Sequence, residues 1–295
     1  TTLFRSMAAN SLGQLSRVLF SVIGTGMAGF VIGMLGSYWA VFAIDGLSFL
    51  LSAFFISRIN ISETRKVVEG DAAAQVRHLM AELGEGLKLI GSSRILTGIV
   101  VGLAAAMLGL GAINVLMPVI VINELQVAET WFGLLELAQA SAMILSGMFV
   151  TLLAARFKAT NIAWVCLLGV GIASFFLAPL SQLWQLFPIL FAIGLVMTPL
   201  QASLSTMMQT TTDPALLGRV GSVLNATMQV ASLTSMFFAG MLAEGLGTRM
   251  VFLIGGTIVC SAALGMALIF RSAVSEAEEP LEADTNEVNL KEVLS

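Results

Sequence analysis

Long apolar stretches without any charged residue alternate with short polar segments along most of this chain. An α-helix rises about 1.5 Å per residue, so roughly 20 apolar residues cross a hydrocarbon core about 30 Å thick. Residues 159–212 carry no charge and are long enough for two crossings, with a polar break at residues 181–182. The pattern predicts an all-α polytopic membrane protein with eight transmembrane helices, at residues 12–36, 38–57, 95–122, 129–155, 161–180, 184–208, 218–244 and 249–271.

Two segments do not fit a membrane span. Residues 58–94 carry charges of both signs, and apolar residues within 78–90 recur at helical spacing, which predicts an amphipathic helix on the membrane surface. Residues 272–295 contain seven acidic residues and one Lys, a composition typical of a solvated, disordered tail. We therefore divide the chain into two spans (1–57), a loop (58–94), a six-span unit (95–271) and an acidic tail (272–295).

The composition supports this interpretation and excludes several functions. Hydrophobic residues make up 57% of the chain and charged residues 11%, whereas soluble domains carry about 25% charged residues. Cys166 and Cys260 have no disulfide or metal-site spacing, and the one histidine, His78, lies in the loop. No catalytic or phosphate-binding motif is present, and the loop has too few aromatic residues for nucleic acid. We expect no enzyme activity, no metal or cofactor, and no nucleic-acid partner.

The basic residues are distributed unequally between the two sides of the membrane. When the eight spans are threaded, every Lys and Arg except Arg249 falls on one side. Basic residues resist translocation, so this side is predicted to be cytoplasmic, and both termini lie on it. The four tryptophans each fall near the start of a span, as expected for an aromatic belt at the membrane surface: Trp39, Trp131, Trp164 and Trp184.

Polar residues within the spans recur at helical spacing. The stripes are Glu136, Gln139, Met143 and Ser146; Thr198, Gln201, Ser205 and Gln209; and Ser222, Asn225, Gln229 and Ser232. Steps of three and four place each set along one helix face. Such a stripe can hold helices together by hydrogen bonds, but several amide-bearing stripes favour a shared water-filled cavity. Its predicted lining is Asn114, Met117, Gln139, Gln201, Asn225 and Gln229.

Two ionisable residues, Asp45 and Glu136, lie well inside predicted spans. A charge placed centrally costs about 2.5–3.5 kcal/mol on insertion scales. A carboxylate escapes part of that cost by binding a proton, which makes both residues candidates for proton coupling. The alternative is structural: Asp45 would cap or pin a helix, and Glu136 would lie near enough to the surface to remain hydrated.

Four segments carry a resemblance to one transporter family: residues 9–17, 42–49, 85–87 and 209–220. The last is the most specific and reads Gln209-Thr-Thr-Thr-Asp213-Pro214-Ala-Leu-Leu-Gly218-Arg219-Val220. In these segments the chain resembles the major facilitator superfamily, in particular its branch of drug and siderophore exporters, which includes the macrolide and enterobactin exporters. The resemblance extends over residues 5–271.

The resemblance implies a fold of two six-helix bundles with the substrate path between them. The eight spans would be helices 5–12, residues 58–94 the inter-bundle loop, and Arg156, Gly218 and Arg219 cytoplasmic gate contacts. Helices 1–4 would be missing, and because the chain starts with Thr rather than Met, we expect a fragment or a separate partner that supplies four spans. The implied location is the bacterial inner membrane.

The implied activity is proton-coupled export of a small organic compound or siderophore by alternating access. Its partners would be the small-molecule substrate, protons and the lipid bilayer. Two alternatives remain open from the sequence. One is a non-transporting or truncated membrane protein that packs against a partner, and the other is a lipid translocator of the same fold.

Overall fold

Helices account for most of the described chain, as the hydrophobic pattern predicts. The computed structural model describes residues 38–58, 72–128, 131–214 and 216–293, together with residues 20, 23–24, 27–28, 31 and 34. The side chains of residues 38, 72–80, 82 and 273–293 are outside this description. The span predicted at 12–36 and the loop residues 59–71 also lie largely outside the described residues, so those predictions are untested.

Among the described residues there is no β-strand. Six helices in the described part of the chain are long and apolar enough to cross a membrane, and Ala159–Phe175 is a shorter apolar helix, an arrangement typical of a multi-pass membrane protein. The elements are α2 (Tyr38–Ser57), α3 (Ala72–Ser92), α4 (Arg94–Val119), the π-helix η1 (Ile120–Glu124), α5 (Phe132–Arg156), α6 (Ala159–Phe175), the 3₁₀ turn η3 (Leu183–Gln185), α7 (Leu186–Thr211), α8 (Leu217–Leu246) and α9 (Thr248–Val293).

Two helix ends beside prolines are irregular. The span predicted at 161–180 ends as an α-helix at Phe175, and the chain continues in turns whose N–H groups bond three residues back, such as Leu177 to Ser174 (3.2 Å). Pro179 follows, and the residue before a proline avoids the helical region. After Pro118, α4 widens into η1, where the Leu125 N–H bonds the carbonyl of Ile120 (2.8 Å).

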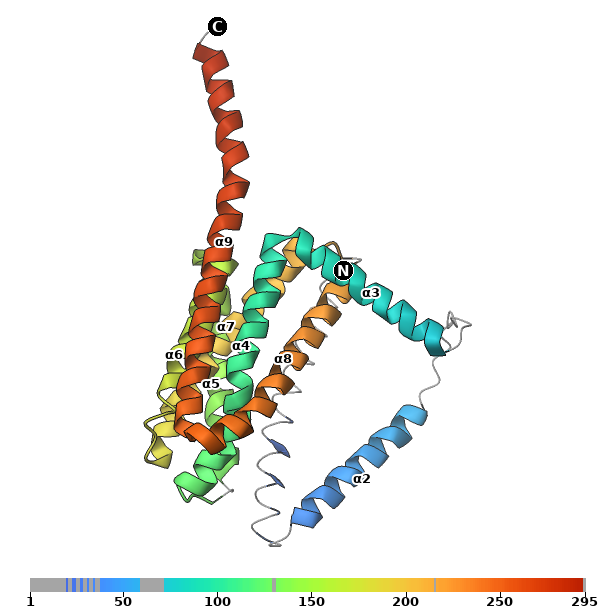
Figure 1. The fold of residues 1–295 in the computed structure, drawn as a ribbon, viewed down its shortest axis with the longest axis vertical. Coiled ribbons are helices and arrows are strands. Elements are labelled where there is room, and N and C mark those ends of the chain that lie inside the picture. The colour runs from blue at the N-terminus through green and yellow to red at the C-terminus, as the bar shows by residue number, and fades with distance from the viewer. Residues whose placement is uncertain are drawn as a thin grey trace.

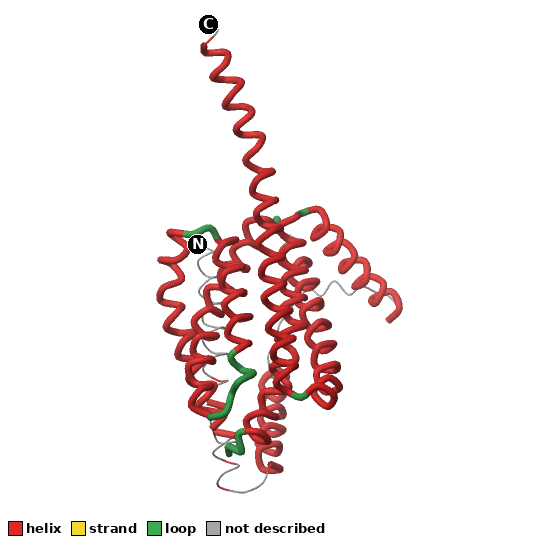
Figure 2. Tube along the Cα trace, turned by 60° about the vertical axis from the view of Figure 1, so that its left-hand side comes forward, coloured by secondary structure: helices red, strands yellow, loops and turns green. Residues whose placement is uncertain are grey.

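Helices α4 to α9 form one bundle, in which α4 packs between α8 and α9 while α7 packs between α5 and α6 (Figures 1 and 2). Glycines allow the closest approaches: a Cβ on Gly109 would lie 2.5 Å from the carbonyl oxygen of Gly255. The buried side chains form two clusters, one around Ile99, Leu167 and Met266 and one around Ile120, Leu177 and Phe252.

Helix α3 packs on the end of this bundle, whereas α2 is exposed. α3 crosses the end of the bundle above α4 and α8 (Figure 1), where Thr97 donates from Oγ1 to the carbonyl of Ile90 (2.8 Å). None of the membrane-length window of α2 is buried. The backbone of α9 continues as helix to Val293. The disordered tail at 272–295 and the division into domains remain predictions.

Candidate functional site

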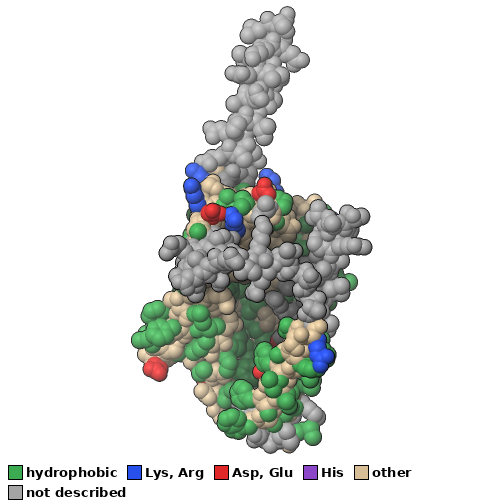
Figure 3. Space-filling view, turned by 90° about the vertical axis from the view of Figure 1, so that its right-hand side faces the viewer, with side chains coloured by type: hydrophobic (Ala, Val, Ile, Leu, Met, Phe, Trp, Pro, Cys, Tyr) green, Lys and Arg blue, Asp and Glu red, His purple; other side chains and the backbone are tan. Residues whose placement is uncertain are grey.

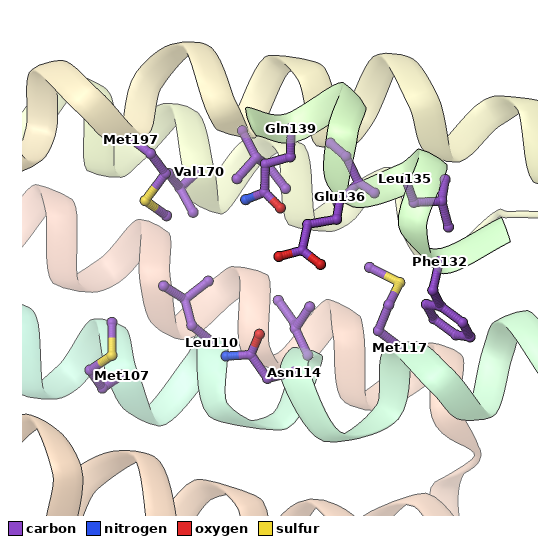
Figure 4. A pocket seen from close by; sticks show the side chains of 13 residues that line it. Met107, Leu110, Asn114, Met117, Phe132, Leu135, Glu136, Gln139, Val170 and Met197 are labelled. Atoms are coloured by element: carbon purple, nitrogen blue, oxygen red, sulfur yellow. The ribbon is translucent and has the colours of Figure 1, made fainter. Parts of the chain in front are cut away.

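The candidate site is a cavity of about 430 Å³ inside the bundle. Side chains of α4, α5, α6 and α7 form its wall, and most of them are apolar (Figure 4). Its lining is Met107, Leu110, Ile113, Asn114, Met117, Phe132, Leu135, Glu136, Gln139, Val170, Leu190, Ile193 and Met197. The polar members, Asn114, Glu136 and Gln139, therefore face a surface rich in leucine, isoleucine and methionine.

Glu136 and Asn114 approach the cavity from opposite sides. The carboxylate of Glu136 extends from α5 and the amide of Asn114 from α4, so that the two point into the same space (Figure 4). Gln139 follows Glu136 by three residues on α5 and lies on the same helix face. Glu136 and Gln139 are half-buried, whereas Asn114 is exposed. The site thus combines one carboxylate with two amides at the edge of an apolar chamber.

Close packing of α5 against α7 holds this wall in place. Gly194 of α7 lies so close to α5 that a Cβ there would collide with the carbonyl oxygen of Gln139. One turn farther along, Thr198 donates from Oγ1 to the carbonyl of Met143 (2.9 Å). An interhelical hydrogen bond of this kind contributes about 0.6 kcal/mol. The backbone that carries Glu136 and Gln139 is therefore fixed to α7.

On the opposite wall, a proline affects the backbone at Asn114. Pro118 lies inside α4 and lacks an N–H, so it cannot donate the helical hydrogen bond that the carbonyl of Asn114 would receive from this position. The π-helical turn η1 begins two residues later. Such turns commonly occur in helices at functional sites.

The structure brings together four of the residues singled out from the sequence. Asn114, Met117, Glu136 and Gln139 all line the cavity. The other predicted lining residues, Gln201 on α7 and Asn225 and Gln229 on α8, are exposed and do not line it. Asn225 donates to the carbonyl of Gly221 in its own helix (2.9 Å).

Asp45, the other carboxylate expected within a span, lies on α2 and is exposed. It is not among the residues that line the Glu136 cavity. The carbonyl of Asp45 accepts a hydrogen bond from Ser48 of the same helix (2.7 Å). The two proposed proton-handling residues therefore do not share a site in the described part of the chain.

Sequence reasoning missed much of the apolar wall. Met107 and Leu110 lie on the same face of α4 as Asn114 and Met117, at steps of three and four residues. That spacing was a usable signal, because extending the stripe in the N-terminal direction leads directly to both residues. Met197 on α7 has no comparable signal, because it depends on which helix packs beside α5.

The predicted gate residues lie at one end of the bundle. Arg219, in the first turn of α8, forms an ion pair with Glu85 of α3. Directly after Glu85, Gly86 packs against Val223 and the backbone of Arg219. Gly218 is exposed with open space around it. Arg156 is also exposed, in the last turn of α5.

The outer surface is consistent with a bilayer environment. Hydrophobic side chains cover much of the sides of the bundle, and most Lys and Arg visible in Figure 3 lie at the end from which α9 extends. Many large apolar side chains are exposed, such as Phe237 (69%) and Met241 (63%) of α8. An exposed apolar surface of this extent would be anomalous for a protein in water. No group of three or more metal-ligating side chains occurs among the described residues.

Comparison with known proteins gives a family and several relatives. The Major Facilitator Superfamily matches residues 99–294, which include nearly all of α4 to α9. The multidrug efflux pump Tap of Mycolicibacterium fortuitum is 28% identical over 83% of this chain and 59% of its own length. Tap of Mycobacterium tuberculosis is 24% identical over 89% and 61%, and macrolide efflux protein A of Streptococcus pyogenes is 23% identical over 81% and 59%. The chain spans about three fifths of the length of these relatives.

Proposed function

This chain belongs to the Major Facilitator Superfamily, and we propose that it acts as part of a secondary active transporter that exports a small organic compound by alternating access. The observation that carries the proposal is the cavity in which Asn114, Glu136 and Gln139 face an otherwise apolar lining. Apolar walls accept the body of an amphiphilic molecule, and a few polar groups orient it. The efflux names of the relatives favour export as the direction.

In this proposal α4 to α9 are the carboxyl-terminal bundle, and the spans at 12–36 and 38–57 belong to the amino-terminal one. The exposed amides Gln201, Asn225 and Gln229 would face the second bundle and complete the path between the two. Four further spans would come from preceding sequence or from a separate chain. The protein would lie in a bacterial inner membrane with both termini in the cytoplasm, as the distribution of basic residues indicates.

We further propose that transport is coupled to protons. Glu136 faces the cavity, where a proton and a cationic substrate would compete for one carboxylate. Asp45 would act at a second position, in the amino-terminal bundle. The substitution Asp45→Asn should abolish the pH dependence of transport, whereas Asp284→Asn in the acidic tail should leave it unchanged. If Asp45→Asn keeps the wild-type pH dependence, Asp45 is not a coupling residue.

The transport proposal is tested with the protein expressed from its natural gene and reconstituted into liposomes. An imposed pH gradient should drive ethidium or a macrolide across the membrane, and a protonophore should stop it. If no solute moves, the chain is not the transporter proposed here. If labelled phospholipid moves between leaflets while the solutes do not, the protein is a lipid translocator of the same fold.

A further inference from the structure

The polar side chains of the cavity at Glu136 lie nearer one end of it than the other. On α4 the lining extends from Met107 to Met117, and Asn114 follows the first by seven residues and precedes the second by three. At about 1.5 Å per residue, the wall therefore continues roughly 10 Å from Asn114 in one direction and about 5 Å in the other. Figure 4 shows the same order on the facing helices, with Glu136 opposite Asn114 and Met197 near the end marked by Met107. The longer part of the lining, the apolar arm, consists of Met107, Leu110, Val170 and Met197.

The polar groups of the cavity favour a ligand with a positive charge and N–H donors. Glu136 supplies a carboxylate, and none of the described residues that line the cavity is Lys, Arg or His. The carboxylate and the amides of Asn114 and Gln139 each offer oxygen atoms that accept hydrogen bonds. A protonated primary amine carries one positive charge and three N–H donors, as the lysine side chain does. An anionic ligand would instead bring a second negative charge beside Glu136, without a cationic partner in the wall.

The apolar arm favours an apolar body on the same ligand. Met107 and Met197 are half-buried, and the flexible methionine side chain adapts to ligands of different shape. Val170 is fully buried in the core cluster around Ile99 and Leu167, so the arm leads from the polar groups into the bundle. The volume of 430 Å³ is near the lower end of the range for ligand pockets, about 300–1,000 Å³. The arm therefore suits a single chain or ring system of modest size.

We propose that this cavity binds an amphiphilic amine in its protonated form, with the N–H groups on Glu136, Asn114 and Gln139 and the apolar body along the apolar arm. The assignment gives the substrate class of the transporter proposed above and rests on that proposed function. Because α4 begins at the predicted cytoplasmic side, the amine would lie toward the outer side and the body toward the membrane centre. A ligand with a charge at each end fits less well, because its second charge would lie in the arm without a polar partner.

The test compares octyl compounds that differ in their head group, by equilibrium dialysis against the full-length protein in nanodiscs of zwitterionic lipid, with empty nanodiscs as the blank. Octylamine, like lysine, is protonated at neutral pH. Octanoate has the opposite charge, and trimethyloctylammonium keeps the positive charge but has no N–H. We expect octylammonium to bind at least about tenfold more tightly than either, the effect of one hydrogen bond to a charged group. If either compound binds as tightly as octylammonium, the proposal is overturned.

Two carboxylate variants locate the amine. Glu136→Gln should remove the preference for octylammonium over octanoate, because it removes the negative charge and keeps the side-chain size. Glu244→Gln, on an exposed carboxylate of α8 outside the cavity, should keep the preference. A preference that survives unchanged in Glu136→Gln means that the amine binds elsewhere, which also overturns the proposal.

A substitution at the far end of the arm locates the apolar body. Met107→Trp should shorten the arm, so that octylammonium binds at least about tenfold less tightly while butylammonium keeps its affinity, since each methylene removed from water strengthens binding about fourfold. Met148→Trp is the control, because Met148 is 70% exposed on α5 and does not line the cavity. If Met107→Trp changes both affinities equally or neither, the body does not lie in the arm. The head-group comparison uses the wild type alone and decides the proposal even where Met107→Trp does not fold.

Binding and transport are measured separately, so the two proposals can fail separately. If octylammonium binds as expected but the reconstituted protein moves no solute, the transport function is wrong and the amine site stands. If the protein transports ethidium or a macrolide but binds octylammonium no more tightly than octanoate, the amine site is wrong and the transport function stands.

Discussion

Arg249, at the start of α9, donates from Nε to Oε2 of Glu124 at the end of η1, across 3.1 Å. The same guanidinium donates from Nη2 to the carbonyl of Leu180 in the connection before α7 (3.0 Å). One side chain thus joins three segments at the end of the bundle opposite Arg219. Arg249 is also the single basic residue on the predicted outer side, and its two partners give it a structural role there.

We expect the Arg249–Glu124 pair to contribute a small, measurable stability. Arg249 is 54% exposed and Glu124 31% exposed, so solvent screening keeps the ion pair near 0.5 kcal/mol. Arg249→Gln should lower the thermal midpoint more than Glu124→Gln, because it also removes the bond to Leu180. Thermal unfolding in detergent measures both, with Lys88→Gln, a change of an exposed side chain on α3, as the control. If the wild type and Arg249→Gln unfold at the same midpoint temperature, Arg249 does not stabilise this end of the bundle.

The Arg219–Glu85 pair should matter more for transport than for stability. Its side chains are 41% and 63% exposed, but it connects α3 to the start of α8, where Gly86 also packs. Arg219→Glu should reduce transport by bringing two carboxylates together, and the exchange Glu85→Arg with Arg219→Glu should restore most of it. Lys88→Glu, on the same face of the membrane, is the control. The idea fails if the exchanged pair transports no better than Arg219→Glu alone.

Gly194 should tolerate no side chain. A methyl group there would collide with the carbonyl of Gln139 and contact Ala142, so Gly194→Ala should destabilise the bundle by about 1–3 kcal/mol through overpacking. Gly240→Ala is the matched change, because nothing lies within 4 Å of its added Cβ, and alanine favours a helix over glycine by up to about 1 kcal/mol. The two variants should therefore shift the thermal midpoint in opposite directions.

The apolar pattern predicted the helices well, because membrane length and charge-free runs are local properties of the chain. The predicted span 38–57 coincides with α2, and 249–271 begins within one residue of α9. The clearest departure occurred beside a proline, because α6 ends at Phe175, before Pro179. The span predicted at 95–122 is present as Arg94–Glu124, but hydropathy does not encode the π-helical turn that follows Pro118.

The site was only partly predictable, for a different reason. Helical spacing identifies residues that share a face, but not the helix that this face meets. Glu136 and Gln139 face α4 across a cavity, whereas Gln201 and Gln229, which have equally regular stripes, lie on exposed faces. Met197 lines the cavity because α7 packs on α5. The spacing of residues along α7 does not predict that contact.

The central claim is that the cavity at Glu136 carries the transported molecule. The most direct test is ethidium efflux by the reconstituted protein with Glu136→Gln, which keeps the side-chain size and removes the charge. Glu244→Gln, on an exposed carboxylate at the end of α8, is the matched control. We expect Glu136→Gln to reduce efflux at least about tenfold, since a charge-assisted contact contributes about 1.5–3 kcal/mol, and Glu244→Gln to transport as the wild type does. If Glu136→Gln, folded and correctly inserted, transports ethidium at the wild-type rate, the substrate does not bind in this cavity.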